Sequence, residues 1–453
     1  MLRIGSAEGF YGDDVTRALP MIEGGHVDVV CFEALSELTL AILRRDQMRD
    51  PRRGYTRDVE LIATRILTAA FARKIPLITN GGGLNPTGAA EAVRAAAEQA
   101  GLRGLKIATV TGDDLLDRLP ALLAAGERLE NIETGEPLSL EGPPIVTANA
   151  YLGAAPIAEA LARGADIVIT GRVADPSLYL APLLHRFGWA PDDWDRLAAG
   201  TICGHLLECT GQIVGGNSLA LLDEIDPAAL AHPGYPIAEV EDDGSFVVTK
   251  VPGTPGRVSQ ETVKEQLLYE MHDPHAYVTP DVVADITTLR LEDAGPDPDR
   301  VRVSGVAGRP RTETLKVNIA RLEGYSRELM FTLGWPRVWQ KERQLRGMLA
   351  AAWEGLPITR VEYSHPGLDS LFGPLVPPPD DPIELMVRVM FTAADAETLK
   401  AAVRRAMALG LSGPAGMSVS PGTVGAEPRP LLGLWPALIR RELVKPAVAL
   451  VAV

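Results

Sequence analysis

The segment from residue 147 to residue 217 constrains the fold of this chain more than any other. A predicted strand ending at Asn149 leads into a predicted helix over Ala155–Arg163, whose apolar residues recur at helical spacing. The apolar run Ala165–Thr170 that follows is typical of a parallel strand with both faces buried. This order predicts a parallel α/β fold, in which ligands bind beyond the carboxyl ends of the strands.

Polar side chains stand at the ends of these two strands. Asn149 ends the first, and Arg172 and Asp175 follow the second. We therefore expect Asn149, Arg172 and Asp175 to meet around one crevice. Arg172 with Asp175 could clamp a carboxylate or orient a base, and the alternative is an internal salt bridge.

His205 and Glu208 lie three residues apart in the same segment, which places them on one face if the segment is helical. They could act as a base with an orienting carboxylate, or as two metal ligands. The alternative is a histidine near a helix end beside a surface glutamate. A metal would need a third ligand, and no H-x-x-x-H or C-x-x-C motif accompanies the pair, so the sequence predicts no metal site.

Polar residues also end other predicted strands in the first part of the chain. Glu8 follows a strand over Leu2–Ala7, and the loop Asn80–Asn85 follows another. Its three consecutive glycines let backbone N–H groups approach an anion or a carbonyl oxygen, unless packing alone requires the turn. The candidate substrate-binding residues are Glu8, Asn80, Gly81, Gly82, Gly83, Asn85 and Asn149, and the candidate catalytic residues are His205, Glu208, Arg172 and Asp175.

Composition narrows the class of protein. The 453 residues, 46% of them hydrophobic, can form several buried cores, and three cysteines are too few for a disulfide scaffold. The net charge of −15 argues against nonspecific nucleic-acid binding. The chain contains no run of 18 apolar residues and no signal peptide, so we expect a cytoplasmic protein without a membrane partner. The basic segment Arg44–Arg57 is either a solvated helix end or a rim that attracts an anionic substrate.

We expect an α/β fold, with a mainly parallel sheet in an N-terminal domain and an α+β C-terminal region. The predicted parts are an α/β domain over 1–225, an α+β domain over 226–365, a proline-rich linker over 366–382 and a small α+β unit over 383–453. Residues 237–251 alternate around Asp242-Asp243-Gly244, which predicts a hairpin. The dinucleotide fingerprint G-x-G-x-x-G does not follow the first predicted strand, and no cofactor is assigned.

Several motifs carry a resemblance to a known family. They are GSAEGFYGDD, ITNGGGLNP, ANAYLGAAPI, GADIVITGRVADPSLYLAPL, GHLLECTGQIVGGN, GYPIAEV, KEQLLYEMHDPHAYVTPDVVAD and LSGPAG. With these motifs the chain resembles the AtuA family of acyclic terpene utilisation proteins over nearly its whole length. The resemblance implies a role in the breakdown of citronellol- and geraniol-type terpenes through acyl-CoA intermediates, and it implies no catalytic residues.

Two hypotheses about function follow. The first is a metabolic enzyme, expected to be a homo-oligomer, that acts on a carboxylate or an acyl-CoA thioester by a lyase or hydration step. Such chemistry needs a general base, here His205 or Glu208, and donors for an enolate-like oxyanion, here Arg172 and the Asn80–Gly83 backbone. The second is a noncatalytic subunit or binding module of an acyl-CoA-processing complex.

Overall fold

The computed structural model describes residues 1–296, 298–375 and 377–453. These residues form two compact units. Unit 1 comprises Met1–Leu138, Val146–Ile319 and Trp435–Val453, and unit 2 comprises Ser139–Ile145 and Ala320–Leu434. The boundary expected near residue 225 falls inside unit 1, and the expected linker over 366–382 falls inside unit 2.

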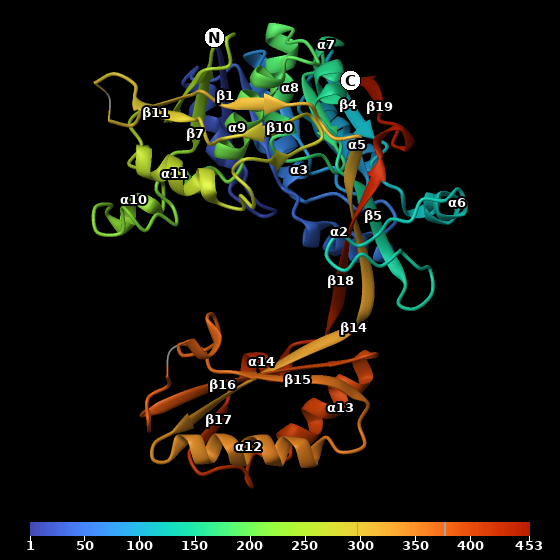
Figure 1. Cartoon of the computed structure of the whole chain (residues 1–453), viewed down its shortest axis with the longest axis vertical. Helices are drawn as coiled ribbons and strands as arrows, with labels where there is room; N and C mark the ends of the chain where they lie inside the picture. The colour runs from blue at the N-terminus through green and yellow to red at the C-terminus, as the bar shows by residue number, and fades with distance from the viewer. Residues whose placement is uncertain (297, 376) are drawn as a thin grey trace. The chain divides into compact units, whose positions relative to one another are not determined.

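Unit 1 is built on a ten-stranded sheet with the strand order β11-β12-β8-β7-β1-β2-β3-β6-β4-β19 (Figure 1). Its central strands are parallel: β1 (Leu2–Ser6), β2 (Val29–Phe32), β3 (Leu77–Thr79), β6 (Ile167–Thr170) and β4 (Lys106–Thr111). The flanking strands are antiparallel: β7 (Pro236–Val240), β8 (Phe246–Lys250), β12 (Val301–Ser304), β11 (Arg290–Asp293) and β19 (Ala447–Ala452).

The expected α/β class is therefore confirmed, and the five strands of this sheet from the first 225 residues are parallel, but the complete sheet is mixed rather than mainly parallel. The hairpin predicted from residues 237–251 forms as β7 and β8, but it pairs with β1 and extends the N-terminal sheet. At the other edge, β19 from the chain's last residues pairs with β4. Both additions supply partners for backbone groups that the parallel strands would leave unpaired at the sheet edges.

A second correction concerns the strand that ends near Asn149. β5 (Ile145–Ala150) lies outside the ten-stranded sheet and pairs with β14 (Thr314–Gly334), a long strand that also pairs with β18 (Arg429–Arg440). The Tyr151 backbone N–H donates to the Lys316 carbonyl at 2.9 Å. Asn149 still reaches the parallel strands, because it forms an isolated bridge with Asp114 just after β4.

Helices cover both faces of the parallel strands. The four residues of β6 are all buried, as a strand covered on two sides requires. The α-helices of unit 1, with one π-helix, are α1 (Ala18–Glu23), α2 (Glu37–Arg49), α3 (Asp58–Leu61), the π-helix (Ile62–Ile66), α4 (Leu67–Ala72), α5 (Pro86–Gln99), α6 (Leu119–Ala124), α7 (Ala155–Ala162), α8 (Ser177–Phe187), α9 (Trp194–Leu207), α10 (Pro227–Leu230) and α11 (Gln260–Leu268). A small antiparallel sheet, β13 (Ala307–Arg309), β10 (Val283–Asp285) and β9 (Tyr277–Val278), packs against α9 through β10 and β13.

Unit 2 is a sheet covered by helices. Its strand order is β15 (Ile358–Ser364), β16 (Glu384–Ala393), β14 and β17 (Met417–Val419). Figure 1 shows α12 (Val338–Ala352) and α13 (Ala396–Met407) along this sheet, and both helices pack on β16. A short helix, α14 (Pro421–Gly425), follows β17. The core side chains Leu329, Phe331 and Leu333 alternate along β14, as residues on one face of a strand must.

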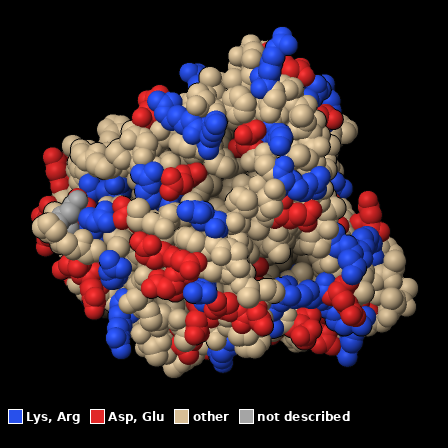
Figure 2. Space-filling model, turned by 90° about the horizontal axis from the view of Figure 1, so that it is seen from above, with Lys and Arg blue, Asp and Glu red and all other residues tan. Residues whose placement is uncertain are grey.

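No helix in the described ranges is long and apolar enough to cross a membrane. Among the described residues on the face shown in Figure 2, basic and acidic side chains are interspersed. This face therefore carries charge of both signs without one continuous basic surface.

Candidate active site

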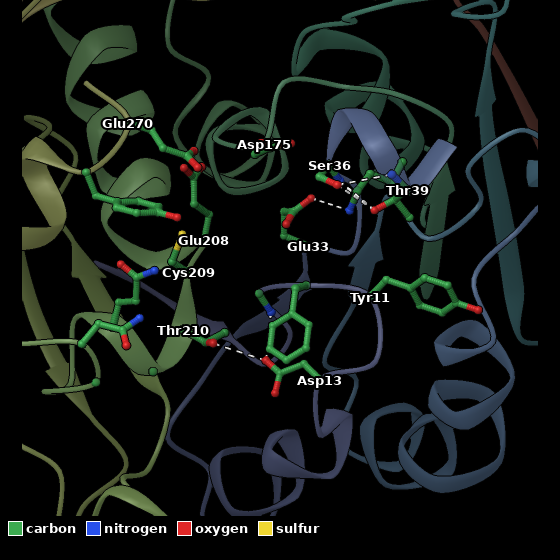
Figure 3. A pocket seen from close by; sticks show the side chains of 18 of the residues that line it. Tyr11, Asp13, Glu33, Ser36, Thr39, Asp175, Glu208, Cys209, Thr210 and Glu270 are labelled. Carbon is green, nitrogen blue, oxygen red and sulfur yellow. Dashed lines mark hydrogen bonds between the residues drawn. The ribbon is translucent and has the colours of Figure 1, made fainter. Parts of the chain in front are cut away.

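A cavity of about 500 Å³ in unit 1 is the candidate active site. Its wall comes from six segments: the loop after β1, the residues from the end of β2 into α2, the loop after β6, the residues after α9, the residue before β7 and the residues after α11 (Figure 3). The lining residues are Gly9, Phe10, Tyr11, Asp13, Glu33, Leu35, Ser36, Glu37, Thr39, Asp175, Glu208, Cys209, Thr210, Gly211, Gln212, Gly216, Asn217, Tyr235, Tyr269 and Glu270.

The start of α2 is held rigidly at the cavity. The Ser36 hydroxyl accepts a hydrogen bond from the Thr39 backbone N–H, and the Thr39 hydroxyl accepts one from the Ser36 N–H. This capping box satisfies backbone donors at the helix N-terminus. Just before it, Glu33 accepts hydrogen bonds from the Leu35 N–H at 2.6 Å and the Asn80 side chain at 2.9 Å.

His205 and Glu208 form a buried pair at the end of α9, as their spacing indicated. His205 Nδ1 lies 3.2 Å from Glu208 Oε1, and His205 Nε2 lies 3.3 Å from the Leu267 carbonyl oxygen. Because a carbonyl can only accept, Nε2 carries the proton of a neutral imidazole, and Nδ1 becomes an acceptor. Glu208 can then donate to Nδ1 only if its carboxyl group is protonated.

Electrostatics favour this neutral arrangement. Burial lowers the pKa of His205, so the imidazole stays uncharged. Burial and the negative charges of Asp175 and Glu270 raise the pKa of Glu208 well above its ordinary value. Figure 3 shows the carboxyl groups of Glu208 and Glu270 pointing toward one another. Within the described part of the chain, Glu208 Oε2 is buried without a hydrogen-bond partner.

Of this pair, Glu208 belongs to the cavity wall, whereas His205 does not line it. The sequence left either residue open as the base. The geometry places Glu208 toward the cavity and His205 behind it, where the imidazole can exchange a proton with the carboxyl group.

Arg172 is completely buried behind the wall. Its guanidinium forms an ion pair with Asp175 at 3.0 Å, donates to the Leu35 carbonyl and lies 4.2 Å from the centre of the Tyr151 ring. Asp175 lines the cavity, whereas Arg172 does not. Of the two roles considered from the sequence, a clamp for a carboxylate or an internal salt bridge, the structure contains the salt bridge. The Arg172 guanidinium therefore influences the cavity through its positive charge and not by direct contact.

Glu37 marks an ionised end of the cavity. The Tyr151 hydroxyl donates to Glu37 Oε1 at 2.5 Å, and Lys316 Nζ lies 3.1 Å from the same oxygen. Burial acts to raise the pKa of Glu37, but the Tyr151 hydrogen bond and the charges of Arg172 and Lys316 outweigh it and lower the pKa to about 2. The cavity therefore joins an ionised carboxylate to carboxyl groups whose pKa values are raised.

Asn80 and Asn149 support the site from behind. Asn80 holds Glu33 and also accepts a hydrogen bond from the Ala34 N–H at 2.8 Å. Asn149 donates to Asp113 Oδ2 at 2.8 Å, and the Arg172 backbone N–H donates to the same oxygen at 2.8 Å. Burial raises the pKa of Asp113 to about 6. Of the three residues expected around one crevice, only Asp175 lines the cavity; Asn149 and Arg172 lie behind it, where Asp113 joins them and Arg172 pairs with Asp175.

The remaining sequence candidates do not line this cavity. Asn85 caps α5 through the Gly88 N–H at 2.9 Å and also donates to the Arg52 and Arg53 carbonyls. The Gly81–Gly83 turn is closely packed, and a Cβ at Gly82 would lie 2.5 Å from the Thr170 carbonyl oxygen. Packing therefore accounts for this turn, and its proposed contact with an anion stays a prediction.

Glu8 is also absent from the wall. Its side chain is fully buried, and burial together with the negative charge of Asp58 raises its pKa well above the ordinary value. The backbone of Glu8 does support the site, because its carbonyl accepts a hydrogen bond from the Glu33 N–H at 3.0 Å.

The arginines of the Arg44–Arg57 segment lie outside the cavity wall. Arg52 pairs with Asp50 and Arg53 with Glu60 at the surface. These pairs fit the interpretation of a solvated helix end.

Sequence reasoning missed Glu37, Tyr151, Tyr269 and Glu270. Tyr151 and Glu37 are 114 residues apart, so local spacing carries no signal of their contact. Glu270 lies just beyond α11, in the left-handed backbone region at φ 57°, and only tertiary packing brings it to Glu208. Within the described residues, no three His, Cys, Asp or Glu side chains are arranged to hold a metal ion.

Comparison with protein families gives one match over nearly the whole chain. The family described as acyclic terpene utilisation family protein AtuA matches residues 2–450. Comparisons with curated proteins and with solved structures gave no match.

Proposed function

This chain belongs to the acyclic terpene utilisation family, and from that premise we propose that it is a metabolic enzyme that moves a proton on the acyl part of a branched, terpene-derived acyl thioester. The reaction class that fits is a carbon–carbon lyase step or a hydration, since both pass through proton transfer next to a thioester carbonyl. The observation that carries the proposal is the buried His205–Glu208 pair, of which Glu208 lies in the wall of the cavity and His205 directly behind it.

The charge of the cavity favours a thioester over a free carboxylate. Among the described lining residues, Asp13, Glu33, Glu37, Asp175, Glu208 and Glu270 are acidic, and no lining residue is Lys, Arg or His. A free carboxylate would face the ionised Glu37 without a cation in the wall. An acyl thioester presents an uncharged head, and its anionic nucleotide tail would remain outside the cavity.

The proton would move through both residues of the pair. Glu208 Oε2 takes the proton from the acyl carbon while the proton on Oε1 passes to His205 Nδ1, which leaves a neutral carboxyl group and an imidazolium. The electron pair of the broken C–H bond moves into the thioester, whose oxygen gains negative charge. Tyr269 and Gln212 line the same cavity and carry O–H and N–H donors suited to that oxygen. Glu270 is exposed, so its side chain can turn away from Glu208 to admit the substrate.

Deuterium exchange tests this proposal without knowledge of the complete reaction. The purified chain is incubated in D₂O with a panel of branched saturated and α,β-unsaturated acyl-CoA thioesters and with the matching free acids, and mass spectrometry follows deuterium in the acyl group. We expect protein-dependent exchange in at least one thioester and none in the free acids. Exchange that requires an added partner chain would support the noncatalytic-subunit hypothesis, and exchange in the acids alone would contradict the choice of a thioester.

A further inference from the structure

Among the described strands, β15 in unit 2 pairs with β16 alone, which leaves its other side open to a strand of another chain. It has seven residues, Ile358–Ser364, and is the terminal strand in the order β15-β16-β14-β17. Val361 is 37% exposed, and the Arg360 side chain is 70% exposed. An edge strand presents backbone N–H and C=O groups that can pair with another chain. β15 contains no proline that would block such pairing.

The charges on β15 are complementary to the same strand turned around. Arg360 and Glu362 lie on one face of the strand, two residues apart, and form an ion pair within the chain. If two copies of β15 pair antiparallel about Val361, Arg360 of each copy lies opposite Glu362 of the other. Directly opposite charges stabilise antiparallel strands, whereas like charges destabilise them.

From this pattern we propose that the chain forms a symmetric homodimer in which β15 pairs with β15 of a second copy about Val361. The β15-β16-β14-β17 sheets of the two copies then join into one continuous sheet. This dimer does not depend on the chemistry proposed for unit 1.

Exposed apolar residues next to β15 can add buried surface to the dimer interface beyond that of the two paired strands. Leu371 is 88% exposed and Phe372 is 73% exposed, and both lie in the segment that follows the strand. Stable interfaces bury on the order of 1,200 Å² or more, so contacts beyond the strands are needed. In an antiparallel pair, this segment of one copy lies near the beginning of β15 in the other.

Charge reversal gives a test with an internal rescue. Arg360→Glu makes all four central charges negative, and Glu362→Arg makes all four positive, so each variant alone should weaken the dimer at least about tenfold. An equimolar mixture of the two variants restores opposite charges across the pair, and so does the double variant Arg360→Glu/Glu362→Arg. Arg404→Glu, at an exposed position on α13, is the matched control.

Sedimentation velocity of the full chain reads the outcome at tens of micromolar protein. We expect a dimer for the native chain, the control, the double variant and the mixture, and mainly monomer for each single variant. A native chain that stays monomeric, as it would if β15 bound a different protein, overturns the proposal. So do single variants that remain dimeric, or a mixture that fails to recover the dimer.

Discussion

Glu208→Gln is the substitution that separates proton transfer from structure at the candidate site. A glutamine side chain has the shape of a protonated glutamate. It can donate from its amide nitrogen to His205 Nδ1, which in the structure lies 3.2 Å from Glu208 Oε1. It cannot take up a proton, so the relay through the pair is lost while the hydrogen bond is kept.

We expect Glu208→Gln to change the reaction rate far more than the stability of the fold. Loss of a general acid–base group costs on the order of a hundredfold to ten-thousandfold in rate. The folded state exchanges one neutral hydrogen-bonding group for another, so the free energy of unfolding should change by no more than about 1 kcal/mol. Because unfolding entropy grows with chain length, for a unit of this size that corresponds to a shift of about 1–2 °C in Tm.

Deuterium exchange into the best thioester, measured beside thermal unfolding, checks both expectations. His185→Ala is the control, because His185 is exposed on α8, and we expect its exchange rate to remain within about twofold of the native rate. Native exchange in a well-folded Glu208→Gln protein would refute the assignment of Glu208 as the proton-transfer group. Asp175 and Glu33, which also line the cavity, would then be the next groups to test.

Three further substitutions follow from the network around the cavity. His205→Gln should fold but lose most exchange and flatten its pH profile, because the amide cannot accept the relayed proton; a native pH profile would leave His205 with a structural role only. Arg172→Met should lower the free energy of unfolding by about 3–5 kcal/mol, since it leaves Asp175 without its buried cation, and urea unfolding measures this loss. Asp113→Asn should alter the pH dependence of stability. The folded pKa of Asp113 is raised from 3.8 to about 6, so the fold favours the protonated form, and ionisation costs up to about 3 kcal/mol as pH rises from 4 through 6. The variant should lack that loss, and identical pH curves for the two proteins would contradict the raised pKa.

Local patterns in the sequence determined several parts of this protein. The apolar run that ends at Thr170 forms the buried strand β6, because four consecutive buried residues suit a strand covered on both faces. The alternation around Asp242-Asp243-Gly244 forms the hairpin of β7 and β8. The three-residue spacing of His205 and Glu208 brings their side chains together, since helix geometry alone makes such residues neighbours. The family resemblance likewise rests on motifs that the sequence displays directly.

Contacts between residues far apart in the sequence decided the remaining strand pairings and the composition of the cavity wall. Such contacts form only after the rest of the chain has packed, so no local pattern predicts them. β5 leaves the parallel sheet to pair with β14, and β19 closes an edge of that sheet from the far end of the sequence. Arg172 follows a buried strand as expected, but Leu35, Tyr151 and Asp175 surround its guanidinium and hold it away from the cavity. Glu270 reaches Glu208 only through the packing of α11 on α9. Burial and neighbouring charges, which no local spacing encodes, then set which carboxyl groups hold a proton.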